Sequence, residues 1–131
     1  GGSQLLRKGG DIVIFACGVM VQLAVQAAEK LSTQGIQASV VNVYSIKPID
    51  RATVCELSAK VGRVLTLENH TVIGGLGDAG SSELAEEGIS VKLKKMGVND
   101  VFAEGASMDY LLKKYKLDVS AIVEGVKAVT G

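Results

Sequence analysis

Apolar positions along the chain follow two different spacings. Residues 12–17 form a short, continuous apolar run that is rich in β-branched side chains and is followed by Gly18. Such a run is typical of a strand that is covered on both faces within a parallel sheet. Residues 21–31 then place apolar side chains at helical spacing. The pattern predicts a buried strand followed by an amphipathic helix.

The same alternation continues to the end of the chain. It predicts further strands at 38–44, 63–67 and 89–96, and helices at 50–61, 75–87, 108–115 and 119–129. Strands that alternate with helices are typical of βαβ units, so we expect an α/β fold with a mainly parallel sheet between layers of helices. Residues 4–7 predict an edge strand, and the tight turn at 8–10 requires it to run antiparallel to the strand that follows.

Length and charge fit one globular domain. The chain has 131 residues, about one domain, and we interpret 1–3 as a remnant of cloning and 4–131 as a single domain. Fourteen basic residues balance fourteen acidic ones, and the lysines at 113, 114 and 116 are best read as a solvated helix face. We therefore expect no nucleic-acid partner and, without an apolar run of about 20 residues, no membrane partner.

The two cysteines, Cys17 and Cys55, lie far apart in sequence. No CxxC spacing argues for redox chemistry, and one histidine with two distant cysteines does not supply a metal-ligand set. Buried, reduced thiols in a cytoplasmic protein are the simplest interpretation. We therefore expect neither a disulfide nor a bound metal.

Polar side chains gather in the loops that follow the predicted strands. In an open parallel sheet, ligands and partner surfaces meet these loops at the carboxyl ends of the strands. The loops at 17–19, 44–50 and 68–77 should therefore share one edge. In the second loop, Asp50 is placed to cap the next helix, and Lys47 is a candidate contact for an anion or a partner.

The third loop contains the only histidine. Its candidate interface or loop residues are Glu68, Asn69, His70, Gly74, Gly75 and Gly77. His70 oriented by Glu68 is a candidate general base, but no Ser or Cys nucleophile lies beside it. A hydrogen bond that fixes the loop or an interface is the simpler interpretation. We therefore assign no catalytic residue.

Gly75, Gly77 and Gly80 also satisfy the GxGxxG spacing of dinucleotide-binding sites. In that motif the first glycine directly follows a strand, which is usually the first strand of the unit. Here residues 69–74 lie between the predicted strand and Gly75, and two βα units precede that strand. Cofactor binding at these glycines is therefore an alternative rather than the leading prediction.

Four stretches, in order, resemble the C-terminal domain shared by transketolase, deoxyxylulose-phosphate synthase and the β subunits of 2-oxo-acid dehydrogenases. They are residues 10–18, 41–50, 67–77, and 96–105 continued by 109–112. One departure is at 77–81, where Gly-Asp-Ala-Gly-Ser replaces the family's usual Gly-Ser-Ala-Val. Asp78 there suits a helix dipole, whereas Gly80 costs a helix about 1 kcal/mol relative to alanine.

The resemblance implies a three-layer α/β/α fold with five strands, mainly parallel and with one antiparallel edge strand. It also implies an enzyme that moves a two-carbon ketol unit between sugar phosphates. In such enzymes thiamine diphosphate and magnesium lie between a pyrophosphate-binding and a pyrimidine-binding domain, across a dimer interface. By resemblance, this domain binds no cofactor, serves dimer assembly and domain packing, and is inactive alone.

The partners implied are those two domains, on the same chain or on a separate subunit, and a second copy in a homodimer. Separation from them should expose Val72, Ile73 and Leu76 and favour self-association. Three alternatives stay open: the same domain from deoxyxylulose-phosphate synthase or a 2-oxo-acid dehydrogenase, a free-standing nucleotide- or anion-binding module, and a dissociable subunit that serves protein contact only.

Overall fold

Nine helices and strands make up the part of the chain that the computed structural model describes, residues 2–71, 75–98 and 117–131. The strands are β1 (Ser3–Arg7), β2 (Ile12–Ala16), β3 (Ala38–Val43), β4 (Arg63–Thr71) and β5 (Lys92–Val98). The helices are α1 (Met20–Ser32), α2 (Arg51–Val61), α3 (Leu76–Glu86) and α5 (Val119–Thr130). The helix predicted at 108–115 and the lysines at 113, 114 and 116 lie outside the described residues.

The five strands form one sheet in the order β1-β3-β2-β4-β5. All neighbouring pairs are parallel except β1 with β3, so the predicted fold class is confirmed. β1 runs antiparallel as predicted, but its partner is β3 and not β2, the next strand in sequence. The physical reason is that β2 is the most apolar strand and lies at the centre, where β3 and β4 occupy both of its edges.

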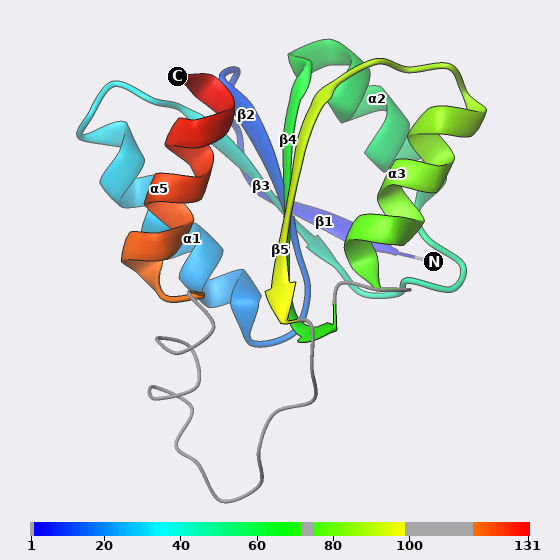
Figure 1. Cartoon of the computed structure of the whole chain (residues 1–131), viewed down its shortest axis with the longest axis horizontal. Coiled ribbons are helices and arrows are strands. Elements are labelled where there is room, and N and C mark those ends of the chain that lie inside the picture. The colour runs from blue at the N-terminus through cyan, green and yellow to red at the C-terminus, as the bar shows by residue number, and fades with distance from the viewer. Residues whose placement is uncertain (1, 72–74, 99–116) are drawn as a thin grey trace, which may run out of the picture.

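Two layers of helices cover the sheet, α1 and α5 on one face and α2 and α3 on the other (Figure 1). Alternate residues of β2 supply both layers, because successive side chains of a strand point to opposite faces. Ile12 and Ile14 pack against α1 and α5, and Val13 and Phe15 pack against α2 and α3. The prediction that this strand is covered on both faces is confirmed.

The largest difference from the expected elements is the length of β4. It was expected to end at residue 67, but it continues to Thr71, so that residues 68–70 belong to a strand and not to a loop. The extension pairs Thr71 with Val98 of β5, after an irregularity in register beyond Leu67. Pairing with a strand distant in sequence prolongs β4, and no local pattern reveals such pairing.

The first residue of α3, Leu76, is buried. The side chain of Leu76 is 1% exposed, so the expectation that it forms part of an exposed apolar surface is wrong. Val72 and Ile73 lie outside the described residues. Ser3, in the segment 1–3 that we interpret as a remnant of cloning, is the first residue of β1. None of the helices in the described ranges has both the length and the hydropathy needed to cross a bilayer.

Candidate functional site

The parallel strands β2, β3 and β4 end at one edge of the sheet. β2, β3 and β4 run in the same direction, so Cys17, Tyr44 and Glu68 lie at what we call the carboxyl edge. β1 runs the opposite way, so its beginning lies at this edge too, and the backbone N–H of Tyr44 donates to the carbonyl of Gly2 at 2.9 Å. The prediction of a shared edge is confirmed for the described residues of these three segments.

Glu68 is a buried anchor for the start of α3. Glu68 is 1% exposed, and its Oε2 accepts a hydrogen bond from the backbone N–H of Gly77 at 2.9 Å. Gly75, the N-cap of α3, supplies no side-chain hydrogen bond, so a carboxylate from β4 takes that role. A negative charge here also interacts favourably with the helix dipole.

Gly77 permits this arrangement because it has no side chain. A Cβ at this position would lie 2.8 Å from Oγ1 of Thr66 and 2.8 Å from Cγ of Lys95. The helix can therefore approach β4 and β5 closely only with glycine there. Because one first-turn amide already binds Glu68, the α3 terminus is poorly suited to a second anion, which counts against the anion-binding alternative.

Cys17 follows β2 and lies near Glu68. Burial, and secondly the charge of Glu68, raise the pKa of the Cys17 thiol to about 11. Both cysteines are free and half-buried, and burial also raises the pKa of Cys55. A thiol with a raised pKa is a poor nucleophile at neutral pH because the thiolate is the reactive form.

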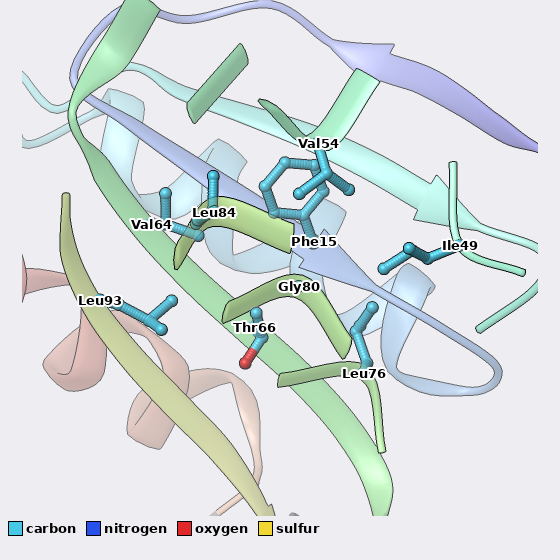
Figure 2. Close-up of a pocket in the computed structure, with 9 residues that line it drawn as sticks. All are labelled: Phe15, Ile49, Val54, Val64, Thr66, Leu76, Gly80, Leu84 and Leu93. Atoms are coloured by element: carbon cyan, nitrogen blue, oxygen red, sulfur yellow. The ribbon is translucent and has the colours of Figure 1, made fainter. Parts of the chain in front are cut away.

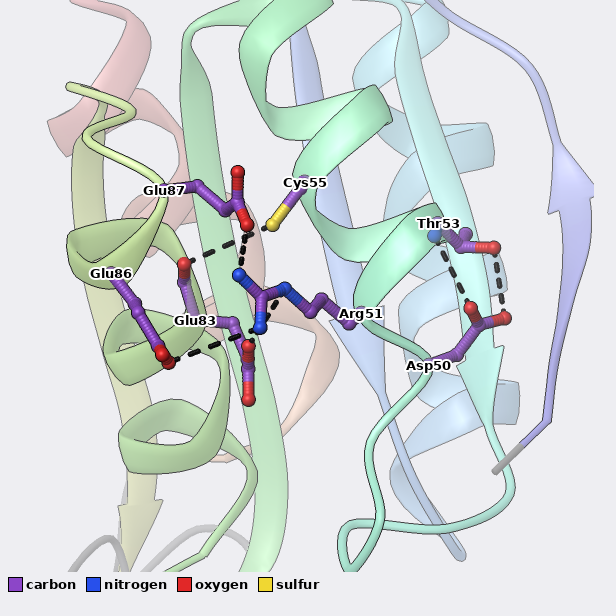
Figure 3. Close-up of polar contacts among 7 residues, drawn as sticks. All are labelled: Asp50, Arg51, Thr53, Cys55, Glu83, Glu86 and Glu87. Atoms are coloured by element: carbon purple, nitrogen blue, oxygen red, sulfur yellow. Dashed lines mark hydrogen bonds and ion pairs between the residues drawn. The ribbon is translucent and has the colours of Figure 1, made fainter.

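Asp50 caps α2, as predicted. Its Oδ1 accepts from the backbone N–H of Thr53 at 3.2 Å, and its Oδ2 accepts from the hydroxyl of Thr53 at 2.8 Å (Figure 3). The hydroxyl of Ser3 donates to the same Oδ2 at 2.6 Å. The hydrogen bonds from Ser3 and Thr53 lower the pKa of Asp50. Asp50 therefore joins β1 to α2 besides capping the helix.

The remaining predicted residues are placed less completely. Lys47 is exposed in the turn before α2, and no hydrogen bond or ion pair of its side chain falls within the described ranges. Asn69 and His70 have a described backbone in β4, but their side chains lie outside the described residues, as does Gly74. The general-base hypothesis for His70 with Glu68 therefore stays a hypothesis.

Gly80, the last glycine of the GxGxxG spacing, faces the interior instead of the carboxyl edge. It lines an apolar cavity of about 10 Å³ between α3 and the sheet, together with Phe15, Thr66 and Leu84 (Figure 2). A Cβ at Gly80 would meet no atom within 4 Å. Because Gly80 lies next to packed side chains, it is not placed to contact a dinucleotide.

One surface hollow at the carboxyl edge was not predicted from the sequence. It has a volume of about 480 Å³ and lies where β2 and β3 end. Its lining includes Cys17, Val21, Asn42, Val43, Tyr44 and Ile46. In the sequence, the signal that points to this place is an aromatic residue, Tyr44, at the end of a predicted strand.

A second unpredicted feature is an ion-pair cluster between α2 and α3. The guanidinium of Arg51 lies 3.2 Å from the carboxylate of Glu83 and 3.9 Å from that of Glu86, and it also contacts Glu87 (Figure 3). The thiol of Cys55 approaches the carbonyl of Glu83 at 3.9 Å. Glutamates one turn apart are visible in sequence, but their shared partner on another helix is not.

Metal-ligating side chains do not converge in the described ranges, where no group of three or more His, Cys, Asp or Glu residues could hold an ion. Asp78 instead forms an ion pair with Lys95 at 2.8 Å, between α3 and β5. Glu68, the buried carboxylate of the edge, binds the backbone of α3. Within the described ranges, the carboxylates of Asp78 and Glu68 thus bind a lysine and a backbone amide.

Comparison with known proteins gives similar sequences over the whole chain. A family model described as "Transketolase, C-terminal domain" matches residues 1–122. The chain is 45% identical over 130 residues to the 6-deoxy-6-sulfo-D-fructose transketolase subunit SqwH of Clostridium sp. strain MSTE9, covering 99% of the chain and 40% of that protein. It is 40% identical over 124 residues to 1-deoxy-D-xylulose-5-phosphate synthase of Desulforudis audaxviator, covering 94% and 20%.

A solved structure agrees with the fold. The chain superimposes on "Split gene transketolase, inactive beta4 tetramer" with a TM-score of 0.91 and 41% identity, covering 98% of this chain and 42% of that one. The chain thus spans only 20% to 42% of the length of these matched proteins. Most of the sequence of each matched protein has no counterpart here.

Proposed function

Since this chain belongs to the transketolase C-terminal domain family, we propose that it packs against the catalytic domains of a transketolase-like enzyme and helps to assemble its dimer. The observation that carries the proposal is that the family match covers nearly the whole chain, while the chain spans less than half of the proteins it matches. A domain of this kind works as part of a larger enzyme. The carboxyl edge, with its anchored α3 and its exposed turn, is the face we assign to packing.

The reaction we propose for the complete enzyme is transfer of a two-carbon ketol unit between sugar phosphates. One relative is named as a 6-deoxy-6-sulfo-D-fructose transketolase subunit and another as a 1-deoxy-D-xylulose-5-phosphate synthase, so the domain occurs in enzymes with different reactions. Formation of deoxyxylulose phosphate is therefore the second candidate. The third candidate is the reaction of a 2-oxo-acid dehydrogenase, in which this domain would belong to the β subunit.

Thiamine diphosphate and magnesium, in this proposal, are held by the pyrimidine- and pyrophosphate-binding domains and not by this one. When bound there, the cofactor supplies the nucleophilic carbon of the reaction. This chain contributes the shape of its carboxyl edge, and Lys47, Glu68, Asn69, His70, Gly74, Gly75 and Gly77 are the residues we assign to that edge or its contacts. The isolated chain is expected to be inactive.

A cytoplasmic location is part of the proposal. Cys17 and Cys55 are both free thiols, which suits a reducing compartment. The formal net charge of zero gives no basis for attraction to nucleic acid or to an anionic membrane.

Calorimetry with thiamine diphosphate and magnesium tests the proposal on the isolated chain. We expect no heat of binding and no rise in thermal midpoint, with dinucleotides as a parallel titration for the module alternative. Micromolar binding of thiamine diphosphate would contradict the proposed role, and micromolar binding of a dinucleotide would support the alternative.

A chimera provides the positive test. In the Desulforudis audaxviator synthase, the matching 124 residues are replaced by this chain. We expect the chimera to form dimers and retain synthase activity, whereas the synthase truncated before these residues should lose both. A truncated synthase that stays dimeric and fully active would contradict a role in assembly.

A further inference from the structure

The hollow at the carboxyl edge has a chemical character that specifies its occupant. Seven residues line it, and none carries a charge at neutral pH. Val21, Val43 and Ile46 make it apolar, and no hydrogen bond of the Asn42 side-chain amide falls within the described ranges. An amide can both donate and accept. The hollow therefore suits an apolar side chain whose own backbone hydrogen-bonds to Asn42.

Exposed apolar side chains stand beside the same hollow. Four large apolar residues of the described ranges are exposed, and two of them are Tyr44 at 61% and Val19 at 43%. Tyr44 lines the hollow, and Val19 directly follows Gly18, another lining residue. Exposed apolar side chains beside an uncharged hollow, with a polar group at its margin, are typical of a protein–protein contact.

The start of the chain lies at this place. Gly2 accepts a hydrogen bond from the backbone N–H of Tyr44, and Gln4 accepts one from the Tyr44 hydroxyl at 2.6 Å. Any polypeptide joined to the amino end of the chain therefore enters beside Tyr44. The matched synthase has most of its length outside the region shared with this chain.

We propose that this hollow receives an apolar side chain from the domain that precedes this one in the complete enzyme, with Tyr44 as the aromatic anchor of the contact. The inference rests on the proposed function and specifies which part of the carboxyl edge carries the packing. A tyrosine at the margin of a pocket provides a large contact area at little cost in conformational entropy, which is why tyrosines are frequent anchors.

Hydrogen exchange in the synthase chimera described above tests the inference. Peptides that span 17–21 and 43–47 should exchange about tenfold more slowly in the chimera than in the isolated chain, since docking excludes water from the hollow. Tyr44→Asp should restore fast exchange in those peptides. Leu6→Asp is the matched control, because Leu6 is 41% exposed on the edge strand β1 and does not line the hollow.

The outcomes separate the two proposals. Slow exchange that Tyr44→Asp abolishes and Leu6→Asp leaves intact supports the contact. An active, dimeric chimera in which 17–21 and 43–47 exchange as in the isolated chain overturns the contact but leaves the packing role. Slow exchange that persists in Tyr44→Asp overturns Tyr44 as its anchor. A chimera without dimers, activity or slowed exchange overturns the packing role and this inference together.

Discussion

Gly77 and Gly80 lie one turn apart in α3 and meet opposite surroundings. A Cβ at Gly77 would clash with Thr66 and Lys95, whereas a Cβ at Gly80 would enter free space beside the cavity of about 10 Å³. The same substitution at the two positions therefore separates helix propensity from packing. The propensity effect follows from the residue type, whereas the packing effect at Gly77 requires the structure.

Gly80→Ala is expected to raise the free energy of unfolding by about 1 kcal/mol, because alanine favours a helix interior by that amount. Gly77→Ala should lower the free energy of unfolding by up to about 2 kcal/mol. Overpacking costs about 1–3 kcal/mol, and the higher helix propensity of alanine offsets only part of that cost. Urea unfolding followed by circular dichroism measures both. Equal effects of the two variants would contradict the packing described for Gly77.

The Cys17 thiol provides a second test at this scale. Its pKa is raised from 9.0 to about 11, so in the folded protein it should react with iodoacetamide only slowly at pH 8. Glu68→Gln removes one cause and should lower the pKa of Cys17 without returning it to the ordinary value, because burial remains. The pH profile of alkylation measures this, and an unchanged profile would rule out the effect of Glu68.

The same shift predicts how stability changes in alkali. Because the folded pKa of Cys17 lies above its unfolded value, its contribution is complete below about pH 9 and is lost as pH rises toward 11. Cys17→Ala should remove this part of the alkaline decline in the free energy of unfolding. Parallel unfolding curves of the two proteins between these pH values provide the check.

At the scale of the element, Asp50 determines where α2 begins. Asp50→Ala should lower the free energy of unfolding by about 0.5–2 kcal/mol, the usual cost of losing an N-cap, whereas Asp50→Asn should keep most of the cap. The depressed pKa of Asp50 means that the contribution of its charge is complete above about pH 3.8 and is lost as pH falls further. Acid unfolding of wild type and Asp50→Asn measures the difference.

Arg51 links α2 to α3 by contacts with three glutamates. All four side chains are partly exposed, so each pair contributes little, and the larger effect of Arg51 is to offset repulsion among the acids. Arg51→Gln should therefore make added sodium chloride stabilising, while Arg51→Lys should behave like wild type. Unfolding at low and high salt measures this, and identical salt dependence of Arg51→Gln and wild type would contradict it.

At the scale of the whole molecule, the two helical layers share one sheet. Alternate residues of β2 belong to the two cores. Loss of packing in one core would therefore expose a strand that the other core also needs. We expect the isolated chain to unfold in one cooperative step. Equal calorimetric and van't Hoff enthalpies would confirm this, and two resolved transitions would contradict it.

The sequence by itself determined the order of helices and strands, because apolar spacing and glycine or aspartate boundaries are local properties. It predicted the buried strand at β2, the cap at Asp50 and the common edge at which β2, β3 and β4 end. The similarity of four stretches to a known family also indicated the class of enzyme. The strand and the cap depend on residues close together in the chain, and the common edge follows from the parallel direction of strands in βαβ units.

Only the tertiary structure decided which distant groups meet. It placed Glu68 against the backbone of Gly77, extended β4 along β5 to Thr71, and paired β1 with β3 instead of β2. It also formed the hollow beside Tyr44 from the ends of two strands and the start of α1. Each of these depends on how the strands are ordered in the sheet, and that order results from competition among apolar surfaces for the centre, which no single segment encodes.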